Sequence, residues 1–277
     1  MILTSRGKIL ELSQPHIMGI LNVTPDSFSD GGEYAHIDKA FSHAKEMVEQ
    51  GATIIDIGGE STRPGASDVL LTEELDRVVP IIKRIKKELD CWVSIDTSKA
   101  VVMSEAVKAG ADMINDVRAL QEEGSLAVAV EADVPVCLMH MQGQPRSMQT
   151  APDYQNVVED VKTFLIERSK LCIDQGIKRE NIIIDLGFGF GKSLQHNFDL
   201  LNATQKFISL GFPVLTGVSR KSMFGQLLNR DINDRLAGSL AGAMIAMQQG
   251  SKIIRVHDVA ETIDVMKVLK QINTFKS

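Results

Sequence analysis

The sequence predicts an α/β protein that folds as a single (β/α)8 TIM barrel with a short N-terminal hairpin. Eight apolar runs of strand length recur along the 277 residues, and amphipathic helical stretches lie between most of them. Most runs are continuously apolar rather than alternating, as expected of parallel strands covered on both faces. The length suits one barrel of about 250 residues. We therefore expect one domain over residues 1–277, with an open doubly wound sheet as the alternative topology.

The expected strands follow one another at regular intervals. In chain order they are HIMGILNV from His16, TIIDIGG from Thr53, CWVSIDT from Cys91, MINDV from Met113, PVCLMHM from Pro135, NIIIDLG from Asn181, PVLTGVS from Pro213 and KIIRVHD from Lys252. Residues 2–12 come before the first of them and predict a short extra hairpin, which we expect to plug the bottom of the barrel.

Helices are predicted where apolar residues return at helical spacing. In residues 72–89 they share one face, with Thr72 as the expected N-cap and Pro80 as a place where the helix can kink. The other stretches are 38–50, 98–109, 154–175, 197–210, 233–249 and 259–272. A glycine stands between several of these helices and the next strand, which is the position of a left-handed C-terminal cap. These glycines are Gly51, Gly110, Gly176, Gly211 and Gly250.

Composition excludes several classes of function. Aromatic residues make up 5% of the chain and the formal net charge is −6, which argues against a nucleic-acid partner. The opening MILTSRGK becomes charged before the apolar core of a signal peptide could form. Residues 236–251 carry no charge but are too short to span a bilayer, and we expect a buried helix whose small residues let neighbours pack closely. The three cysteines show no disulfide or zinc spacing, so we expect a cytoplasmic protein without a membrane partner.

Polar residues stand at the carboxyl ends of nearly all the expected strands, where barrel enzymes place their active sites. Loop solvation alone also predicts polar residues after strands, but the mixture is more informative. Carboxylates and amides follow the third, fourth and sixth strands, and cations follow the seventh and eighth. Such a ring could hold a flat heterocycle with donor and acceptor edges beside an anionic group. The candidates are Asn22, Glu60, Thr62, Asp96, Asn115, Asp116, His140, Asp185, Ser219, Arg220, Lys221, Ser222, Arg255, His257 and Asp258.

Two features at these strand ends favour an anion. Arg255 and His257 are two residues apart on one strand, so both point the same way and could clamp a phosphate, although a surface ion pair is the alternative. The motif SRKS at residues 219–222 ends a strand and opens a helix, whose free N–H groups suit a carboxylate or phosphate. The alternative is an ordinary capped helix, which would show the same sequence pattern.

The motif GFGFGKS at residues 187–193 resembles a nucleotide-binding loop but does not match the spacing of either known glycine motif. A Walker loop needs glycine at position 186, where this chain has Leu186, and the dinucleotide fingerprint also fails in register. We expect the alternating glycines to turn the backbone tightly beneath a planar ligand. The long loops over residues 22–32 and 58–67 are predicted to be binding loops. No motif for zinc or covalent catalysis is present.

Taken together, these motifs identify a family. MGILNVTPDSFSDGG, IDIGGESTRPGA, SIDTSK, INDVRAL, GFGFGKS, SRKS and IIRVHD, in this order and spacing, resemble the bacterial dihydropteroate synthases. The resemblance runs from about Pro15 to Val259. One position departs from the family pattern, because Leu186 stands where the family has proline. On this resemblance we expect Leu186→Pro to be tolerated.

The resemblance implies the fold inferred above and a folate-pathway transferase reaction. The enzyme would condense 6-hydroxymethyl-7,8-dihydropterin diphosphate with 4-aminobenzoate, giving 7,8-dihydropteroate and diphosphate. It also implies Mg²⁺ as the cofactor, small molecules as the only substrates, a homodimer, and a target for sulfonamides. Diphosphate would leave first, and the aminobenzoate nitrogen would then attack a cationic methylene without a strong general base.

Residue roles are carried over from the family position by position. The pterin diphosphate site would comprise Thr62, Asp96, Asn115, Asp185, Lys221, Arg255 and His257. The 4-aminobenzoate site would comprise Phe28, Arg63, Pro64, Phe190 and Ser222. Asn22 would coordinate Mg²⁺, a hard cation that takes oxygen ligands. The groups expected to act in catalysis are Asp26, Lys221, Arg255 and His257, with Asp26 stabilising the cationic intermediate.

Two other functions share part of this pattern. A barrel that presents methyltetrahydrofolate for methyl transfer would share the pterin acids but would not need SRKS or the Arg255–His257 pair. A catalytically silent pterin-binding paralogue would keep the fold and lose site residues, whereas this chain departs from the pattern only at Leu186.

Overall fold

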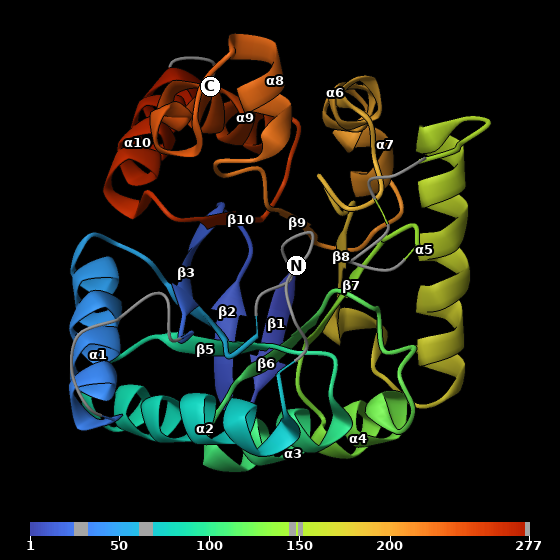
Figure 1. The fold of residues 1–277 in the computed structure, drawn as a ribbon. Helices are drawn as coiled ribbons and strands as arrows, with labels where there is room; N and C mark the ends of the chain where they lie inside the picture. The colour runs from blue at the N-terminus through green and yellow to red at the C-terminus, as the bar shows by residue number, and fades with distance from the viewer. Residues whose placement is uncertain (25–32, 61–68, 144–147, 149–151, 275–277) are drawn as a thin grey trace.

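The computed structural model describes residues 1–24, 33–60, 69–143, 148 and 152–274. Over these residues, parallel strands close into a barrel in the order β10-β3-β4-β5-β6-β7-β8-β9. Figure 1 looks into the barrel, with the strands at the centre and the helices arranged around them. Closure is made by β10 (Ile253–Val256), which pairs in parallel with β3 (His16–Asn22). The (β/α)8 barrel is therefore confirmed, and the open doubly wound sheet is excluded.

Each predicted strand is present. Between β3 and β10 the barrel strands are β4 (Ile54–Gly58), β5 (Trp92–Asp96), β6 (Met113–Asp116), β7 (Val136–Met139), β8 (Ile182–Asp185) and β9 (Val214–Thr216). The helices are α1 (Glu33–Glu49), α2 (Leu71–Glu88), α3 (Ala100–Ala109), α4 (Ser125–Ala132), α5 (Val157–Asp174), α6 (Leu194–Asn202), α7 (Thr204–Ile208), α8 (Ser222–Leu228), α9 (Leu236–Gln248) and α10 (Val259–Thr274). Two short 3-10 turns, η2 (Arg179–Asn181) and η3 (Ile232–Asp234), precede β8 and α9.

The N-terminal hairpin closes the floor of the barrel, as predicted. Strands β1 (Ile2–Ser5) and β2 (Lys8–Glu11) pair antiparallel and carry Leu3 and Leu10 into a buried cluster. That cluster contains one inward side chain from every barrel strand. Its barrel members are Met18, Ile54, Trp92, Met113, Cys137, Ile183, Leu215 and Ile253. Apolar packing therefore fills the lower barrel and leaves polar chemistry to the other end.

The glycines that follow the helices also agree with the prediction. Gly51, Gly110, Gly176, Gly211 and Gly250 all have positive φ. The expected cap of the second helix was wrong, because α2 begins at Leu71 and its N-cap, Leu70, makes no side-chain cap bond. The acidic first turn of α2 forms an ion pair outside the helix, because the Lys99 Nζ lies 2.6 Å from the buried Glu74 carboxylate.

The segment predicted as one helix over residues 197–210 is two helices, α6 and α7. The Thr204 hydroxyl donates to the carbonyl oxygens of Leu200 at 3.2 Å and Leu201 at 3.0 Å. The Gln249 side chain also donates to the Leu201 carbonyl, at 2.7 Å. Side chains thus donate hydrogen bonds to the carbonyl groups at the end of α6, and the helix ends there.

The uncharged helix α9 is only partly buried, which corrects the expectation of a buried helix. Its small residues do pack closely, because a Cβ at Gly238 would come within 2.8 Å of the Phe224 ring. Its outer face, however, is open, with Met244 38% and Ile245 37% exposed. Among the described residues no helix is long and apolar enough to cross a membrane.

Candidate active site

The polar side chains of the barrel interior lie directly above its apolar floor. Side chains alternate along a strand, so the residue two positions after a floor residue also points inward. Asn115 follows Met113, Asp185 follows Ile183, and Arg255 follows Ile253 in this way. Strand register then makes neighbours of Asn22, Gly58, Asp96 and Asn115 across β3, β4, β5 and β6. The sequence prediction that these residues share one site agrees with this register.

The Arg255 guanidinium is the centre of this cluster. Its Nε donates to the Asp56 carboxylate at 2.6 Å, and its Nη2 donates to the Asp96 carboxylate at 2.6 Å. The Asn115 amide donates to the same Asp56 oxygen at 3.1 Å. Burial alone would lower the pKa of Arg255, but the two carboxylates outweigh it and raise that pKa above its ordinary value.

Two carboxylate oxygens in the cluster have no partner among the described residues. They are Asp56 Oδ1 and Asp96 Oδ1, and both are buried. Burial raises the pKa of Asp96 to about 7, although Arg255 opposes that shift. A buried acceptor without a donor costs free energy, so the cluster is suited to a ligand that presents N–H groups.

Asp185 and Lys221 add a second acid and a cation to the site. Asp185 Oδ1 accepts the Gly187 N–H at 2.7 Å, and burial raises the pKa of this carboxyl against the opposing effect of Lys221. Burial, with a smaller contribution from Arg255, lowers the pKa of Lys221 to about 8. The Lys221 Nζ lies 4.3 Å from the centre of the Phe190 ring, a cation–π distance.

The two residues of the proposed anion clamp differ in their surroundings. The Arg255 side chain is engaged by acids, whereas His257 Nδ1 lies 3.0 Å from the Ser219 hydroxyl. Ser222 opens the short helix α8 and is exposed. It lines a cavity of about 260 Å³ together with the buried Lys192 and Asn197.

Several strand-end candidates are structural. Asp116 accepts the N–H groups of Arg118 and Leu120 and so closes the turn after β6. Arg220 pairs with Asp258. Glu60 lies 2.9 Å from the Lys99 ammonium, and His140 contacts Lys192. Asp26, Phe28, Thr62, Arg63 and Pro64 lie outside the described residues.

Asn22 is the predicted magnesium ligand, and its surroundings fit that role. The half-buried Asn22 stands beside Gly58, where a Cβ would lie 3.7 Å from Asn22 Oδ1 and 3.7 Å from the Asp96 Cβ. The missing side chain leaves a small cradle bordered by oxygen donors. In the described part of the chain, no cluster of three His, Cys, Asp or Glu side chains could hold a metal by itself. The amide oxygen of Asn22 is of the ligand type that Mg²⁺ takes.

Two functional candidates escaped the sequence analysis. Asp56 is fully buried in β4 and holds Arg255. An acid in the middle of the apolar run TIIDIGG was the available signal, since a charge there must have a buried partner. Lys192 was seen only as part of the glycine loop, yet it is 3% exposed and surrounded by backbone carbonyls.

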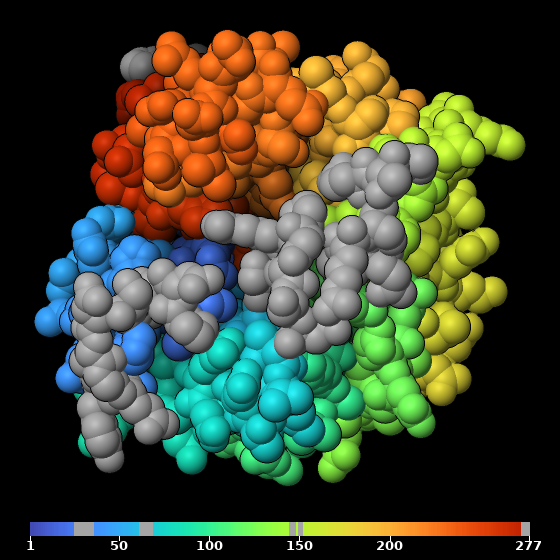
Figure 2. Space-filling view, viewed as in Figure 1, coloured from blue at the N-terminus to red at the C-terminus, as the bar shows by residue number. Residues whose placement is uncertain are grey.

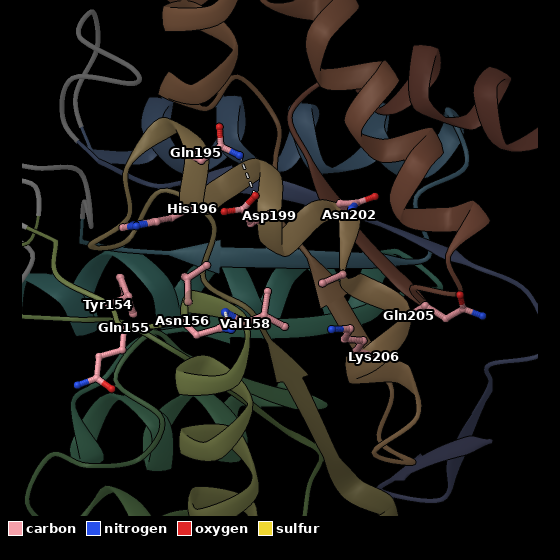
Figure 3. Close-up of a pocket in the computed structure, with 12 residues that line it drawn as sticks. Tyr154, Gln155, Asn156, Val158, Gln195, His196, Asp199, Asn202, Gln205 and Lys206 are labelled. Carbon is pink, nitrogen blue, oxygen red and sulfur yellow. Dashed lines mark hydrogen bonds between the residues drawn. The ribbon is translucent and has the colours of Figure 1, made fainter.

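A larger surface cavity lies away from this cluster. It measures about 700 Å³ and is bordered by the start of α5 and by α6 and α7 (Figure 3). Its one carboxylate, Asp199, is bonded to Gln195 at 2.8 Å. No residue predicted for the site lines it, so we place the chemistry at the barrel interior.

The fold and the site define a class. This is a (β/α)8-barrel enzyme whose interior carries a cluster of buried acids and an amide at the carboxyl ends of the strands. A family model described as "Pterin binding enzyme" matches residues 18–257. The dihydropteroate synthase of Haemophilus influenzae is 57% identical over 268 residues, covering 97% of this chain and 98% of the relative.

Solved structures agree with this class. The Yersinia pestis dihydropteroate synthase, crystallised with a sulfonamide drug complex, is similar at a TM-score of 0.94 and 51% identity, covering 99% of this chain and 100% of that one. The Xanthomonas albilineans enzyme in complex with 7,8-dihydropteroate is similar at a TM-score of 0.90 and 43% identity, with 99% of both chains covered. The chain belongs to the dihydropteroate synthase family, and its enzymatic class is that of a transferase.

Proposed function

We propose that the chain condenses 6-hydroxymethyl-7,8-dihydropterin diphosphate with 4-aminobenzoate, and that the buried acids of the barrel hold the pterin. The observation that carries this assignment is the group of Asp56, Asp96, Asn115 and Asp185 in the barrel interior, with unpaired oxygens on Asp56 and Asp96. A carboxylate is the natural acceptor for the paired amino and ring N–H groups of a pterin. The structure of a relative with 7,8-dihydropteroate supports a pterin product for this chain too.

We propose that pterin binding changes the contacts of Arg255. Its Nη2 donates to one oxygen of Asp96, the acid assigned to the pterin, while the other oxygen of Asp96 has no partner among the described residues. The pterin N–H groups would take over that carboxylate, while Asp56 keeps its bond to the Arg255 Nε. The released end of the guanidinium would then stack on the pterin face and turn to the diphosphate.

The second substrate is assigned to the mouth of the barrel. Phe190, with Lys221 packed on its ring, would form one wall for the aminobenzoate ring. Ser222, exposed at the start of α8, would bind the carboxylate. Phe28, Arg63 and Pro64 complete this proposed site. The sulfonamide complex of a relative supports sulfonamides as ligands of this chain too.

The chain's own cations would assist departure of the diphosphate. Arg255, once freed from Asp96, and His257 would stabilise the negative charge that develops on the leaving oxygen, while Thr62 would hold the diphosphate. Asn22 would hold Mg²⁺, which neutralises phosphate charge when bound. Lys221 would face the pterin, and Asp26 would stabilise positive charge on the methylene. The amine of 4-aminobenzoate would then attack without a strong general base.

We also propose that the chain is a cytoplasmic homodimer with one domain per subunit. Exposed apolar side chains gather on the last three helices, whose surface is orange to red in Figure 2. They are Leu227, Leu228, Leu236, Met244, Ile245, Val268 and Ile272. Helix α9 contains no charged residue to solvate its open face. A second copy of this face would remove these side chains from water.

The reaction is tested by diphosphate release with purified protein, the pterin diphosphate and Mg²⁺. We expect release that depends on 4-aminobenzoate, together with formation of 7,8-dihydropteroate. Methyl transfer from methyltetrahydrofolate instead would identify the methyl-presenting barrel. Pterin binding without turnover would identify a silent paralogue.

A further inference from the structure

The side chain of Lys192 is almost completely buried in the loop between β8 and α6. Its Nζ donates to the carbonyl oxygens of Gly187 at 2.9 Å and Phe190 at 3.0 Å, and more weakly to that of His140 at 3.3 Å. It also lies 3.0 Å from His140 Nδ1. In the described part of the chain no carboxylate lies within ion-pair distance of it. An ammonium group buried without a counter-ion is costly, so its carbonyl contacts require an explanation.

The polar groups around Lys192 are satisfied in either protonation state. An ammonium group has three N–H donors, enough for the three carbonyl oxygens. Burial lowers the pKa of Lys192 to about 7, and a neutral amine keeps two N–H donors for the carbonyl oxygens and could accept a hydrogen bond from the His140 Nδ1–H. Burial and the nearby Lys192 lower the pKa of His140 to about 3, so the imidazole stays neutral. Lys192 therefore stays bonded to the loop across the ordinary pH range.

The loop that Lys192 holds has little freedom to take another path. A Cβ at Gly187 would lie 1.8 Å from the His140 carbonyl oxygen, and a Cβ at Gly191 would lie 2.4 Å from that of Gln142. Both glycines have positive φ. The Tyr154 hydroxyl also donates to the Gly191 carbonyl at 2.8 Å. The backbone is thus pressed against the segment after β7, and its carbonyl groups turn inward to Lys192.

Phe190 and Lys221 depend on the course of this loop. The Phe190 carbonyl is bonded to Lys192 while the ring supports the Lys221 ammonium at 4.3 Å. A Cβ at Gly189 would lie 3.2 Å from the Lys221 Cδ, so the loop also provides the space for that side chain. Holding the Phe190 carbonyl therefore fixes both the ring and the cation packed on it.

We propose that Lys192 is a positioning residue that fixes the Phe190–Lys221 pair through the backbone carbonyls of residues 187 and 190, and so sets the affinity for 4-aminobenzoate. The inference rests on the proposed function, because it takes Phe190 as a wall of the aminobenzoate site. It assigns the buried charge to loop geometry rather than to contact with a substrate. Two of the pterin residues, Asp96 and Asn115, are held by strand pairing and not by the loop, whereas Asp185 ends strand β8 and contacts the loop only through the Gly187 N–H.

The test compares substrate affinities in Lys192→Met, which keeps the length of the side chain and removes its donors. We expect the KM for 4-aminobenzoate to rise about tenfold, the effect of losing one to two net hydrogen bonds, while the pterin diphosphate Kd from calorimetry stays within about threefold. Lys178→Met, which removes an exposed lysine paired with Asp133, is the matched control and should leave both constants unchanged. An equal loss for both substrates, or no change in either, would overturn the proposal.

A double-mutant cycle separates positioning from general destabilisation. If Lys192 acts through Phe190, then Lys192→Met added to Phe190→Leu should raise the aminobenzoate KM little beyond Phe190→Leu alone. Additive effects would overturn the proposal. Should Lys192→Met fail to fold, Lys192→Gln keeps two donors and should show the same selective defect to a smaller degree. Turnover by the unmodified chain tests the proposed function separately, so the two failures are distinguishable.

Discussion

The behaviour of single residues in this site depends on how two buried acids, Asp56 and Asp96, share the Arg255 guanidinium. Arg255 bonds to Asp56 and Asp96 at the same distance of 2.6 Å, yet the two acids serve different ends. Asp56 also accepts from Asn115 and lies deeper in β4, so it acts as the permanent partner of Arg255. In the proposed function, Asp96 would exchange its bond to Arg255 for the N–H groups of the pterin.

Replacing Asp185 by asparagine should abolish useful pterin binding. The amide presents a donor where the carboxylate offers two acceptors, and loss of a charged partner from a buried hydrogen bond costs about 1.5–3 kcal/mol. Asp185 also accepts the Gly187 N–H, so the turn after β8 would loosen as well. Calorimetry with a pterin analogue measures the effect. Unchanged affinity in Asp185→Asn would contradict the assignment of this acid.

Pterin affinity should depend on pH in the direction set by Asp96 and Lys221. The pKa of Asp96 is raised to about 7, so below that pH the acid is protonated and loses an acceptor. Affinity should therefore fall up to about tenfold per pH unit on the acid side. The pKa of Lys221 is lowered to about 8, so affinity should also fall above that pH as the ammonium is lost. Measurements of the pterin Kd from about pH 5.5 to 9.5 would show both losses of affinity.

The Asp96→Asn variant provides the control for that profile. It should bind more weakly at every pH and should lack the acidic limb, because the titrating group is gone. A profile that is flat between about pH 6 and 8 in the unmodified chain would contradict the proposed role of Asp96.

At the scale of elements, α8 and α9 pack through glycine rather than through a large apolar face. A Cβ at Gly238 would meet three atoms of Phe224 within 3.0 Å, including its Cβ, which cannot move away as a flexible chain end could. Gly238→Ala would gain about 1 kcal/mol of helix propensity. Overpacking costs roughly 1–3 kcal/mol, and because the contact involves the Phe224 Cβ we expect the upper part of that range, so the net loss of stability should approach about 2 kcal/mol.

Urea unfolding of Gly238→Ala measures that loss, with Gln248→Ala as the matched variant on the same helix. Gln248 is exposed at the last position of α9, so its substitution should change stability by less than about 0.5 kcal/mol. A Gly238→Ala protein more stable than the original chain would show that α8 shifts to make room.

The elements differ in how far the sequence could predict them. Each barrel strand was predicted because an apolar run of the right length is a local signal, and Gly110 and Gly176 marked helix ends for the same reason. The break between α6 and α7 is made by the local Thr204 and also by Gln249, whose side chain lies 48 residues away from Leu201, and no local pattern records that second contact. The bond between Asp56 and Arg255 spans 199 residues and needs the closed barrel to exist.

The burial of Leu186 changes the expectation that proline is tolerated at position 186. The family pattern suggested that proline would be tolerated there, but the Leu186 side chain is fully buried in the main core. The carbons lost on substitution cost about 1–3 kcal/mol, more than the roughly 0.4–1 kcal/mol that proline gains from the unfolded state. The structure therefore favours leucine at this position of this chain.

At the scale of the whole molecule, α8, α9 and α10 carry several exposed apolar side chains, and we propose that a second copy of the chain covers them. Helix α9 has no charge, and the sequence could not tell whether its apolar face packs inside one chain or between two. Ile245→Lys should yield monomers, because a charge at a desolvated interface costs several kcal/mol. Sedimentation velocity measures the change. Ile166→Lys, at a similarly exposed isoleucine on α5, is the control and should stay dimeric, and loss of the dimer in both variants would contradict this interface.

The hairpin beneath the barrel has a kinetic consequence. Because β1 and β2 seal one end with Leu3, Leu10 and Leu12, molecules can enter and leave the interior through the opposite end only. The pterin acids lie deep, whereas Ser222 is exposed at the rim. In a pocket with a single opening, the molecule that enters last must leave first. With the two substrate sites proposed above, a molecule at the rim would block the deeper site, so we expect the pterin to bind before 4-aminobenzoate and an inhibitor at the rim to slow its release.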